Sequence, residues 1–363
     1  MKDVGARIYR KLAEEWLLVL ALAATLVLSL ALGRRPRFSA DELEVVVLLG
    51  LLFASVRGLE QSGLMDRIAC GLERGRHVAP KLVLATFVLA ALVTNDVALV
   101  VVVPLTLGLR TGDRAALVML EAFAANAGSA LSPIGNPQNL YLYWHYRLDP
   151  LPFVATIAPF SLGLLAVLLL AALSRPGGAA DEARPRPAVR RSALLYLALL
   201  GVLVGVVLRL LPFAAAWAVA AVLMVAGRDA LARVDYALLA TFLVLFALVD
   251  QFGWLLAPRL EHVGHVFAAA ALTSQLIGNV PAAVLLAEFT SRWPALLWGV
   301  SVGGFGSLVA SFANLIAWRL YQAREPDPAA RRRFTLRFLL YGYLLFAFGA
   351  LLYALWVQTG GRA

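Results

Sequence analysis

The sequence predicts an all-α polytopic membrane protein whose two halves are inverted repeats. Three observations lead to this fold: the apolar content of the 363-residue chain, a series of apolar segments that can cross a bilayer, and motifs that occur twice in the same order. Hydrophobic residues make up 61% of the chain, against about 45–50% in a typical soluble domain. We therefore expect one membrane unit rather than two soluble domains.

The composition excludes several classes of protein. The net charge of +10 is typical of Lys and Arg retained on the cytoplasmic side of a membrane protein, so we expect no nucleic-acid partner. The single cysteine, Cys70, rules out an intrachain disulfide and a cysteine-based metal cluster, and no cofactor is expected. The first apolar segment is followed by Gly33-Arg34-Arg35-Pro36 instead of a small-residue cleavage site, which predicts a retained span.

About 20 apolar residues form a helix that crosses the hydrocarbon core of a bilayer. The segments that can cross are 16–32, 43–58, 115–145, 151–174, 192–208, 212–227, 237–256, 294–322 and 336–358. Two of them, 115–145 and 294–322, are too long for one span and carry Gly, Ser, Asn or Pro near their middles, which predicts broken helices. Two further stretches, 79–109 and 265–290, have short apolar arms around a polar or Pro-bearing tip, which is typical of re-entrant helical hairpins.

The basic residues predict the orientation in the cytoplasmic (inner) membrane. With nine spans and two re-entrant hairpins, 24 of the 32 Lys and Arg residues fall on one face and 8 on the other. The positive-inside rule then places the N-terminus in the cytoplasm and the C-terminus outside. Trp144, Trp293 and Trp298 fit the aromatic belts at the two membrane surfaces.

A polar linker over residues 175–191, predicted to be cytoplasmic, divides the chain into the halves 1–174 and 192–363. Segments 58–64, 94–98 and 128–140 match segments 248–254, 278–282 and 304–315, at offsets of 190, 184 and 175. Five crossings separate span 43–58 from its partner 237–256, so the repeats are predicted to be inverted. Inverted repeats with discontinuous helices are typical of secondary transporters, which hold their substrate near the midplane. Chance similarity between apolar helices is the alternative.

The two hairpin tips and the two helix breaks are the predicted binding site. Backbone that leaves helical geometry at membrane depth must be buried in protein or line an aqueous cavity, and Asn offers a donor and an acceptor there without a charge. The candidate substrate- or ion-binding residues are Thr94, Asn95, Asp96, Ser132, Gly135, Asn136, Asn139, Gly278, Asn279, Ser307, Ser311 and Asn314.

Two carboxylates are candidates for proton coupling. Asp96 is the carboxylate in a hairpin tip, where a charge is costly unless it is paired or hydrated. It is interpreted either as a proton- or cation-carrying group or as a cap of the following helix. Glu121 lies in an otherwise apolar arm and is either a second protonatable site or a residue that reaches the cytoplasmic surface.

At these motifs the chain resembles the ion-transporter superfamily, as an anion-permease-like member. That group includes arsenite permeases, NhaD-type sodium–proton antiporters, citrate transporters and divalent-anion/sodium symporters. The resemblance covers roughly residues 43–358 and rests on Thr94–Leu99, Ser132–Asn139 and Gly278–Pro281. It implies a homodimer whose outer helices form a scaffold for a mobile, hairpin-bearing domain. The tips differ from the Ser-Asn-Thr of dicarboxylate symporters.

These observations predict a secondary active transporter that moves a small anion or oxyacid by alternating access with proton coupling, with arsenite or another metalloid as the specific candidate. A sodium–proton antiporter and a sodium-coupled dicarboxylate or sulfate symporter are the alternatives, so the coupling ion is H+ or Na+. An enzyme is not expected, because His-Glu-x-x-His and Gly-x-Ser-x-Gly motifs are absent. The sequence alone does not separate a transporter from a channel.

Overall fold

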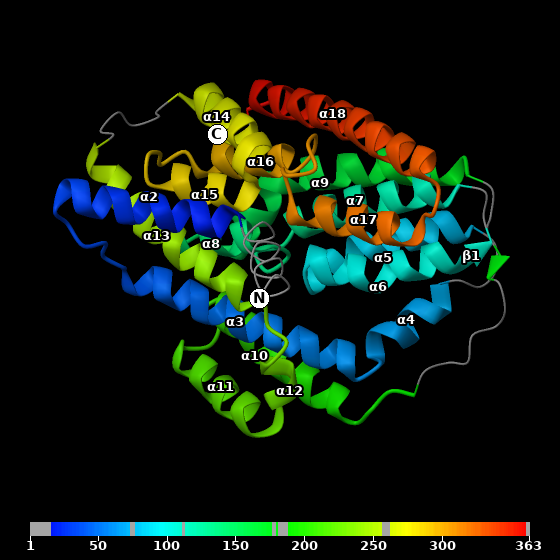
Figure 1. Cartoon of the computed structure of the whole chain (residues 1–363), viewed down its shortest axis with the longest axis horizontal. Helices are drawn as coiled ribbons and strands as arrows, with labels where there is room; N and C mark the ends of the chain where they lie inside the picture. The colour runs from blue at the N-terminus through cyan, green and yellow to red at the C-terminus, as the bar shows by residue number, and fades with distance from the viewer. Residues whose placement is uncertain are drawn as a thin grey trace, which may run out of the picture.

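The computed structural model describes residues 16–72, 77–110, 113–175, 179–180, 188–255 and 262–360. Over these residues the fold is helical, which confirms the predicted all-α class (Figure 1). The exception is a two-residue antiparallel ladder between β1 (Leu109–Arg110) and β2 (Ala179–Ala180). This ladder joins the end of the first hairpin to the described part of the predicted linker.

Seven of the predicted spans are continuous helices. They are α2 (Trp16–Leu32), α3 (Ala40–Gln61), α9 (Pro150–Leu173), α10 (Ser192–Val207), α11 (Ala214–Ala226), α13 (Tyr236–Leu255) and α18 (Pro328–Gln358). By length and apolar composition, α9 and α18 can each cross a membrane, and the other apolar helices are shorter or carry more charge. The short helices α4 (Leu64–Leu72) and α12 (Arg228–Leu231) follow α3 and α11.

Local sequence signals set the helix ends. At the start of α3 the Ser39 hydroxyl accepts a hydrogen bond from Glu42 N at 3.2 Å, while the Glu42 carboxylate accepts one from Ser39 N at 2.6 Å. This reciprocal capping box satisfies amide groups that have no partner in the first turn. Asp327 caps α18 in a similar way, and Pro328 at the first position of that helix has no N–H to leave unpaired.

The predicted hairpins and broken helices are confirmed as helical elements with the expected interruptions. The hairpin arms are α5 (Val78–Leu92) with α6 (Asn95–Gly108) and α14 (Val263–Ile277) with α15 (Asn279–Ala287). The broken helices are α7 (Arg114–Ala130) with α8 (Pro137–His145) and α16 (Trp293–Gly303) with α17 (Phe312–Arg324). The intervening breaks cover residues 131–136 and 304–311.

Each hairpin packs against the broken helix of its own half, and the second arms then cross to the other half. In the first half α5 packs on α7, and in the second half α14 packs on α16. Glycine allows both approaches: a Cβ on Gly128 would lie 2.1 Å from Phe87 O, and a Cβ on Gly303 would lie 2.6 Å from Ser274 Cβ. Across the halves, α6 packs on α17 and α15 packs on α8.

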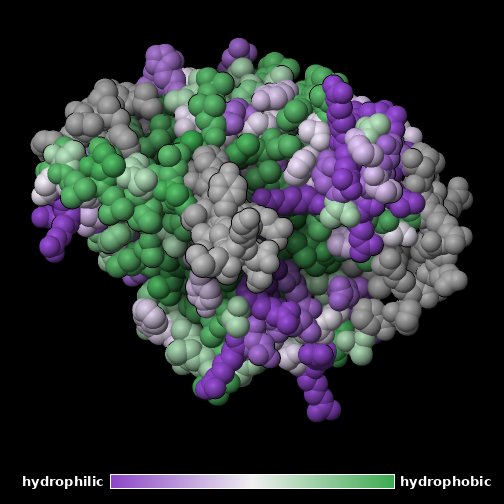
Figure 2. Space-filling view, viewed as in Figure 1, coloured by the Kyte–Doolittle hydropathy of each residue, from purple (hydrophilic) through white to green (hydrophobic). Residues whose placement is uncertain are grey.

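The remaining helices surround this centre. Figure 1 shows α14 and α18 side by side across the top and α3 across the lower part, with the broken helices and the other hairpin arms between them. In Figure 2 hydrophilic residues gather toward the right of this face, where α17 ends and α18 begins, and apolar surface covers much of the left. Leucines on the outer face of α18, such as Leu340 and Leu344, are exposed, as expected of a helix that faces lipid.

The aromatic-belt prediction is wrong for Trp298. Its side chain is fully buried, and its indole N–H donates to Thr156 O at 2.9 Å. Phe160 of α9 and Trp356 of α18 pack against it, with ring centroids 5.6 and 5.4 Å away. Helices α9 and α18 therefore enclose α16 and keep this ring away from the membrane surface.

Candidate functional site

Each hairpin tip is docked on the break of its own half by a backbone hydrogen bond. Asn95 N donates to Gly135 O at 3.1 Å, and Asn279 N donates to Ala310 O at 2.9 Å. The donors are separated by the offset of 184 residues, and the acceptors by the offset of 175 residues, that relate the two halves in the sequence. The same contact therefore forms twice, between equivalent positions.

Two asparagines organise the first break. Asn136 begins α8: its side-chain oxygen accepts from Asn139 N at 2.9 Å, and its Nδ2 donates to Ser129 Oγ at 3.1 Å. The side-chain nitrogen of Asn139 donates to three carbonyl oxygens at 3.0–3.1 Å, those of Ser129 and Ala130 at the end of α7 and of Ser132 in the break. Gly135 is required because a Cβ there would lie 2.3 Å from Ser129 O.

The second break uses the equivalent asparagine. Asn314 Nδ2 donates to Gly304 O at 3.0 Å and to Ser307 O at 3.1 Å, at positions equivalent to two of the Asn139 acceptors. Gln275 of α14 adds a second support, since its Nε2 donates to Gly303 O at 2.7 Å and its Oε1 accepts from Ser307 N at 2.9 Å. Sequence reasoning missed Gln275, and its counterpart in the first half is Ala91, which has no polar side chain.

Asn126 of α7 joins the two halves and was not among the predicted site residues. Its Nδ2 lies 2.8 Å from Asn314 Oδ1, and its Oδ1 accepts from the Ser311 hydroxyl at 2.9 Å. The signal available in the sequence was an amide inside an otherwise apolar helix. The first broken helix and the second break thus share one buried polar network.

The starts of three half-helices lack side-chain caps. Thr94 is the N-cap of α6, Gly278 of α15 and Ser311 of α17, and none of their side chains accepts a capping hydrogen bond. Gly278 also has a φ of +91°, a conformation that Gly adopts readily. Because Thr94 occupies the N-cap, the interpretation of Asp96 as the capping residue is wrong. Asn95 N and Asn279 N are used by the docking bonds and Asp96 N donates to Asn95 Oδ1, so the remaining first-turn N–H groups are those that can meet a negatively polarised ligand.

Several buried oxygens near the site have no hydrogen-bond partner among the described residues. They include Thr94 Oγ1, Asp96 Oδ1 and Asn139 Oδ1. Glu121 is fully buried, so the prediction that it reaches the cytoplasmic surface is wrong. The Thr106 hydroxyl donates to one of its carboxylate oxygens, and the other is unpaired within the described part of the chain.

The charge balance of the site limits what it can hold. Among the described residues the buried polar side chains are those of Ser, Thr, Asn, Gln and one acid, Glu121, with no Lys or Arg. The same residues contain no group of three His, Cys, Asp or Glu side chains arranged to hold a metal ion. These residues can bind a ligand through hydrogen bonds and helix-terminal dipoles, and a carboxylate among them can take up a proton.

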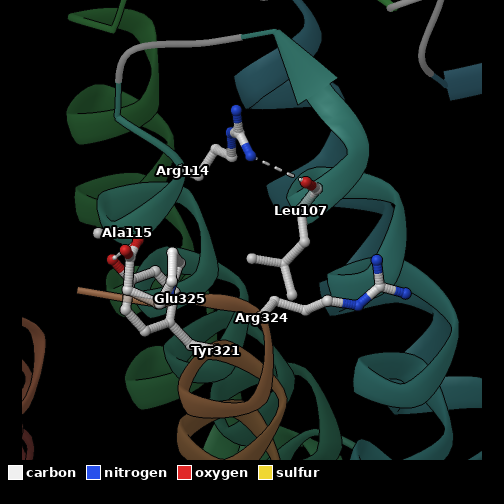
Figure 3. Close-up of a pocket in the computed structure, with 7 residues that line it drawn as sticks. Leu107, Arg114, Ala115, Tyr321, Arg324 and Glu325 are labelled. Carbon is white, nitrogen blue, oxygen red and sulfur yellow. Dashed lines mark hydrogen bonds between the residues drawn. The ribbon is translucent and has the colours of Figure 1, made fainter. Parts of the chain in front are cut away.

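Two cavities open near the ends of the central helices. Figure 3 shows the first, about 490 Å³ in volume, lined by Leu107, Arg114, Ala115, Tyr321, Arg324, Glu325 and Pro326. There Arg114 donates to Leu107 O at 3.3 Å, and Tyr321 OH donates to Glu325 at 3.3 Å. The second cavity, about 440 Å³ in volume, is lined by Arg57, Glu60, Gln61, Met65, Asp66, Val100, Val101 and Arg233. Its two valines follow Asp96 by about one turn of α6.

Comparison with known proteins places this chain among transporters. Residues 11–303 match the model of a family described as citrate transporter. The chain is 35% identical over 328 residues to the inner membrane protein YbiR of Escherichia coli, with 85% of each chain covered.

Two further relatives are also transporters by name. An uncharacterized transporter of Methanocaldococcus jannaschii, MJ0456, is 29% identical over 317 residues, covering 84% of this chain and 88% of its own length. The silicon efflux transporter LSI3 of Oryza sativa subsp. japonica is 26% identical over 399 residues, covering 80% of this chain and 81% of its own length. The similarity extends over most of the chain in each case.

Proposed function

Since the chain belongs to the citrate transporter family, whose members are membrane transporters and not enzymes, we propose that it is a secondary active transporter. It moves a small anion or oxyacid across the cytoplasmic membrane by alternating access, with proton coupling. The observation that carries this proposal is the pair of equivalent bonds, Asn95 N to Gly135 O and Asn279 N to Ala310 O. They support two inverted repeats, the architecture that secondary transporters use to hold a midplane site.

The two repeats with their flanking helices are the halves 1–174 and 192–363. The cytoplasmic linker 175–191 joins them. The crosswise packing of α6 on α17 and of α15 on α8 supports one shared site between them. The gathering of hydrophilic residues toward one end of the helices in Figure 2 supports the cytoplasmic placement of that end. We further propose a homodimer that forms through the outer helices.

The substrate is bound by the twelve tip and break residues predicted from the sequence, together with Asn126. Three uncapped helix starts support recognition of a negatively polarised group, because their N–H groups carry the positive end of the helix dipole. The absence of buried Lys and Arg among the described residues favours an oxyacid of low net charge over a multiply charged anion.

Protons are carried by Asp96, with Glu121 as a second candidate. Each has a buried oxygen with no partner among the described residues, which supports a group that binds and releases a proton. The cavity near Val100 and Val101 supports access to Asp96 from the side of the Arg57–Glu60 ion pair, whose atoms are 2.9 Å apart.

A metalloid oxyacid is the specific substrate candidate. The relative LSI3 is named for silicon efflux, and an uncharged metalloid hydroxide fits a site of hydrogen-bonding groups without a basic residue. Sodium–proton antiport and sodium-coupled dicarboxylate or sulfate symport are the competing functions, and the experiment below separates them from the proposal.

The test is proton flux into proteoliposomes loaded with a pH dye and challenged in turn with arsenite, sulfate, phosphate, citrate, succinate and sodium. We expect a pH response to one oxyacid that is lost in Asp96→Asn and retained in Asp41→Asn, a change in a half-exposed carboxylate at the start of α3. A response to sodium alone would favour the antiporter. A response to an anion that persists at the wild-type ratio in Asp96→Asn would overturn the coupling assignment.

A further inference from the structure

The cavity in Figure 3 is lined from both halves of the chain, by charged side chains that the proposed transport site does not use. Arg114 lies at the start of α7, while Tyr321, Arg324 and Glu325 lie at the end of α17. The volume of about 490 Å³ falls within the range of about 300–1,000 Å³ that is typical of small-molecule sites. The cavity therefore has room for a ligand that contacts both halves.

The charges of the lining favour a singly charged anion. Two arginines and one glutamate line the cavity, so its net charge is +1. The Arg324 side chain has no hydrogen-bond or ion-pair partner within the described part of the chain, and in Figure 3 its guanidinium extends away from Tyr321 and Glu325. Arg114 donates to Leu107 O at 3.3 Å and keeps its other N–H donors. Guanidinium groups match the geometry of phosphate oxygens, so this lining fits a phosphodiester, which carries one negative charge.

The position of the cavity favours a lipid over a free anion. The Tyr321 ring stacks on Phe334 of α18, with the ring centroids 4.0 Å apart. Only two residues, or about 3 Å of helix rise, separate Phe334 from Leu336. Leu336 begins a row of exposed leucines on α18 that continues with Leu340 and Leu344. The cavity thus lies at the level where the lipid-facing surface of α18 begins.

The surroundings of the cavity are basic as well. Arg331, Arg332 and Arg333 lie in the first two turns of α18, and Arg331 Nε donates to Glu325 O at 2.5 Å. The topology predicted from the sequence puts this end of the helices on the cytoplasmic side, where anionic lipids give the membrane surface its negative charge. Basic pockets between helices on that side are suited to lipid headgroups.

We propose that this cavity binds the headgroup of an anionic glycerophospholipid from the cytoplasmic leaflet. Arg114 and Arg324 bind the phosphate. The Glu325 carboxylate already accepts from Tyr321 OH and Asp327 N, and its remaining lone pairs accept from headgroup hydroxyls. The bound headgroup connects α7 of the first half to α17 of the second. This inference goes beyond the proposed function, since it holds whichever substrate is moved.

The test is thermal unfolding of the full chain in detergent micelles titrated with phosphatidylglycerol or with phosphatidylcholine. We expect phosphatidylglycerol to raise the Tm to a plateau, because a ligand that binds only the folded state stabilises it, and phosphatidylcholine to leave the Tm unchanged. Arg324→Gln should raise the apparent Kd for phosphatidylglycerol by at least about tenfold, because charge-assisted hydrogen bonds to the phosphate are lost.

The matched control is Arg332→Gln, which removes an exposed arginine of α18 that does not line the cavity. It should leave the Kd near the wild-type value. Equal weakening in Arg324→Gln and Arg332→Gln would indicate attraction to the basic surface in general and overturn the site, as would equal effects of the two lipids. Inorganic phosphate and glycerol 3-phosphate are the soluble probes, and a Tm rise with either at the concentration that suffices for phosphatidylglycerol overturns the lipid assignment. These measurements need no transported substrate, so a failure of the proposed function would leave them unaffected.

Discussion

The side-chain amide of Asn126 donates to the side-chain oxygen of Asn314 at 2.8 Å, and this bond joins the broken helix of one half to the break of the other. The Ser311 hydroxyl completes the network by donating to Asn126 Oδ1 at 2.9 Å. The centre of the molecule is therefore held by polar contacts between halves as well as by apolar packing.

Asn126→Ala should destabilise the protein. It leaves the buried oxygens of Asn314 and Ser311 without their partner, and each unsatisfied buried group costs about 1–3 kcal/mol. Thermal unfolding in detergent measures the effect as a lower Tm. Ser55→Ala is the control, since that hydroxyl has no partner to lose among the described residues. Equal Tm values for the two variants would contradict the structural role of Asn126.

Gly135→Ala should displace the first break and abolish transport. The new Cβ would lie 2.3 Å from Ser129 O, so the backbone must move, at a cost of roughly 1–3 kcal/mol. Gly201→Ala in α10 is the matched change, because no other atom lies within 4 Å of its Cβ. It should leave transport intact and, by helix propensity, add up to about 1 kcal/mol of stability. Transport by Gly135→Ala at the wild-type rate would show that the break tolerates the shift.

Glu121→Gln should preserve folding and lower the number of protons moved per substrate molecule, if Glu121 carries protons. The amide oxygen of Gln can still accept the hydrogen bond from the Thr106 hydroxyl, so packing is retained while ionisation is lost. The measurement is the ratio of proton to substrate flux in proteoliposomes. If the proton-to-substrate ratio is unchanged in Glu121→Gln and proton flux is lost in Asp96→Asn, Asp96 carries all of the coupled protons.

Two substitutions of Asp113 should separate its helix cap from its ion pair. The carboxylate accepts from Ala116 N at 3.2 Å at the start of α7 and also pairs with Arg175. Asp113→Asn keeps a capping oxygen and should cost less than about 1 kcal/mol, because the pair is partly exposed. Asp113→Ala loses both contacts and should cost about 1–2 kcal/mol. Chemical unfolding measures both, and equal losses would mean that the cap contributes nothing.

The sequence predicts the helix layout well because its signals are local. The hairpin arms end within about three residues of the expected points, since an apolar arm and a Gly-, Asn- or Pro-bearing tip are visible in a short window. The Asn and Ser positions of the breaks follow from the same interruptions. The predicted residues lie at the tips, in the breaks or in the first turn of the helix that follows, and the hydrogen bonds repeat at the offsets read from the sequence.

The residues that sequence reasoning missed act across long separations. Asn126 is the one amide side chain in α7, and its role depends on which helix of the other half lies opposite. Gln275 donates to the Gly303 carbonyl 28 residues away and accepts from the Ser307 N–H 32 residues away, around a break whose shape the sequence does not specify. Trp298 was misplaced for the same reason, because its burial depends on α9 and α18.

The separation of 188 residues between Asn126 and Asn314 has a consequence for biogenesis. A ribosome that has just delivered α7 to the translocon has yet to synthesise α17, so the nascent first half enters the lipid with an amide whose eventual partner does not exist. The first half must therefore stay inserted with the Asn126 amide unpaired until α17 has been made. The hydrogen bond between the two halves forms only when most of the chain has been made.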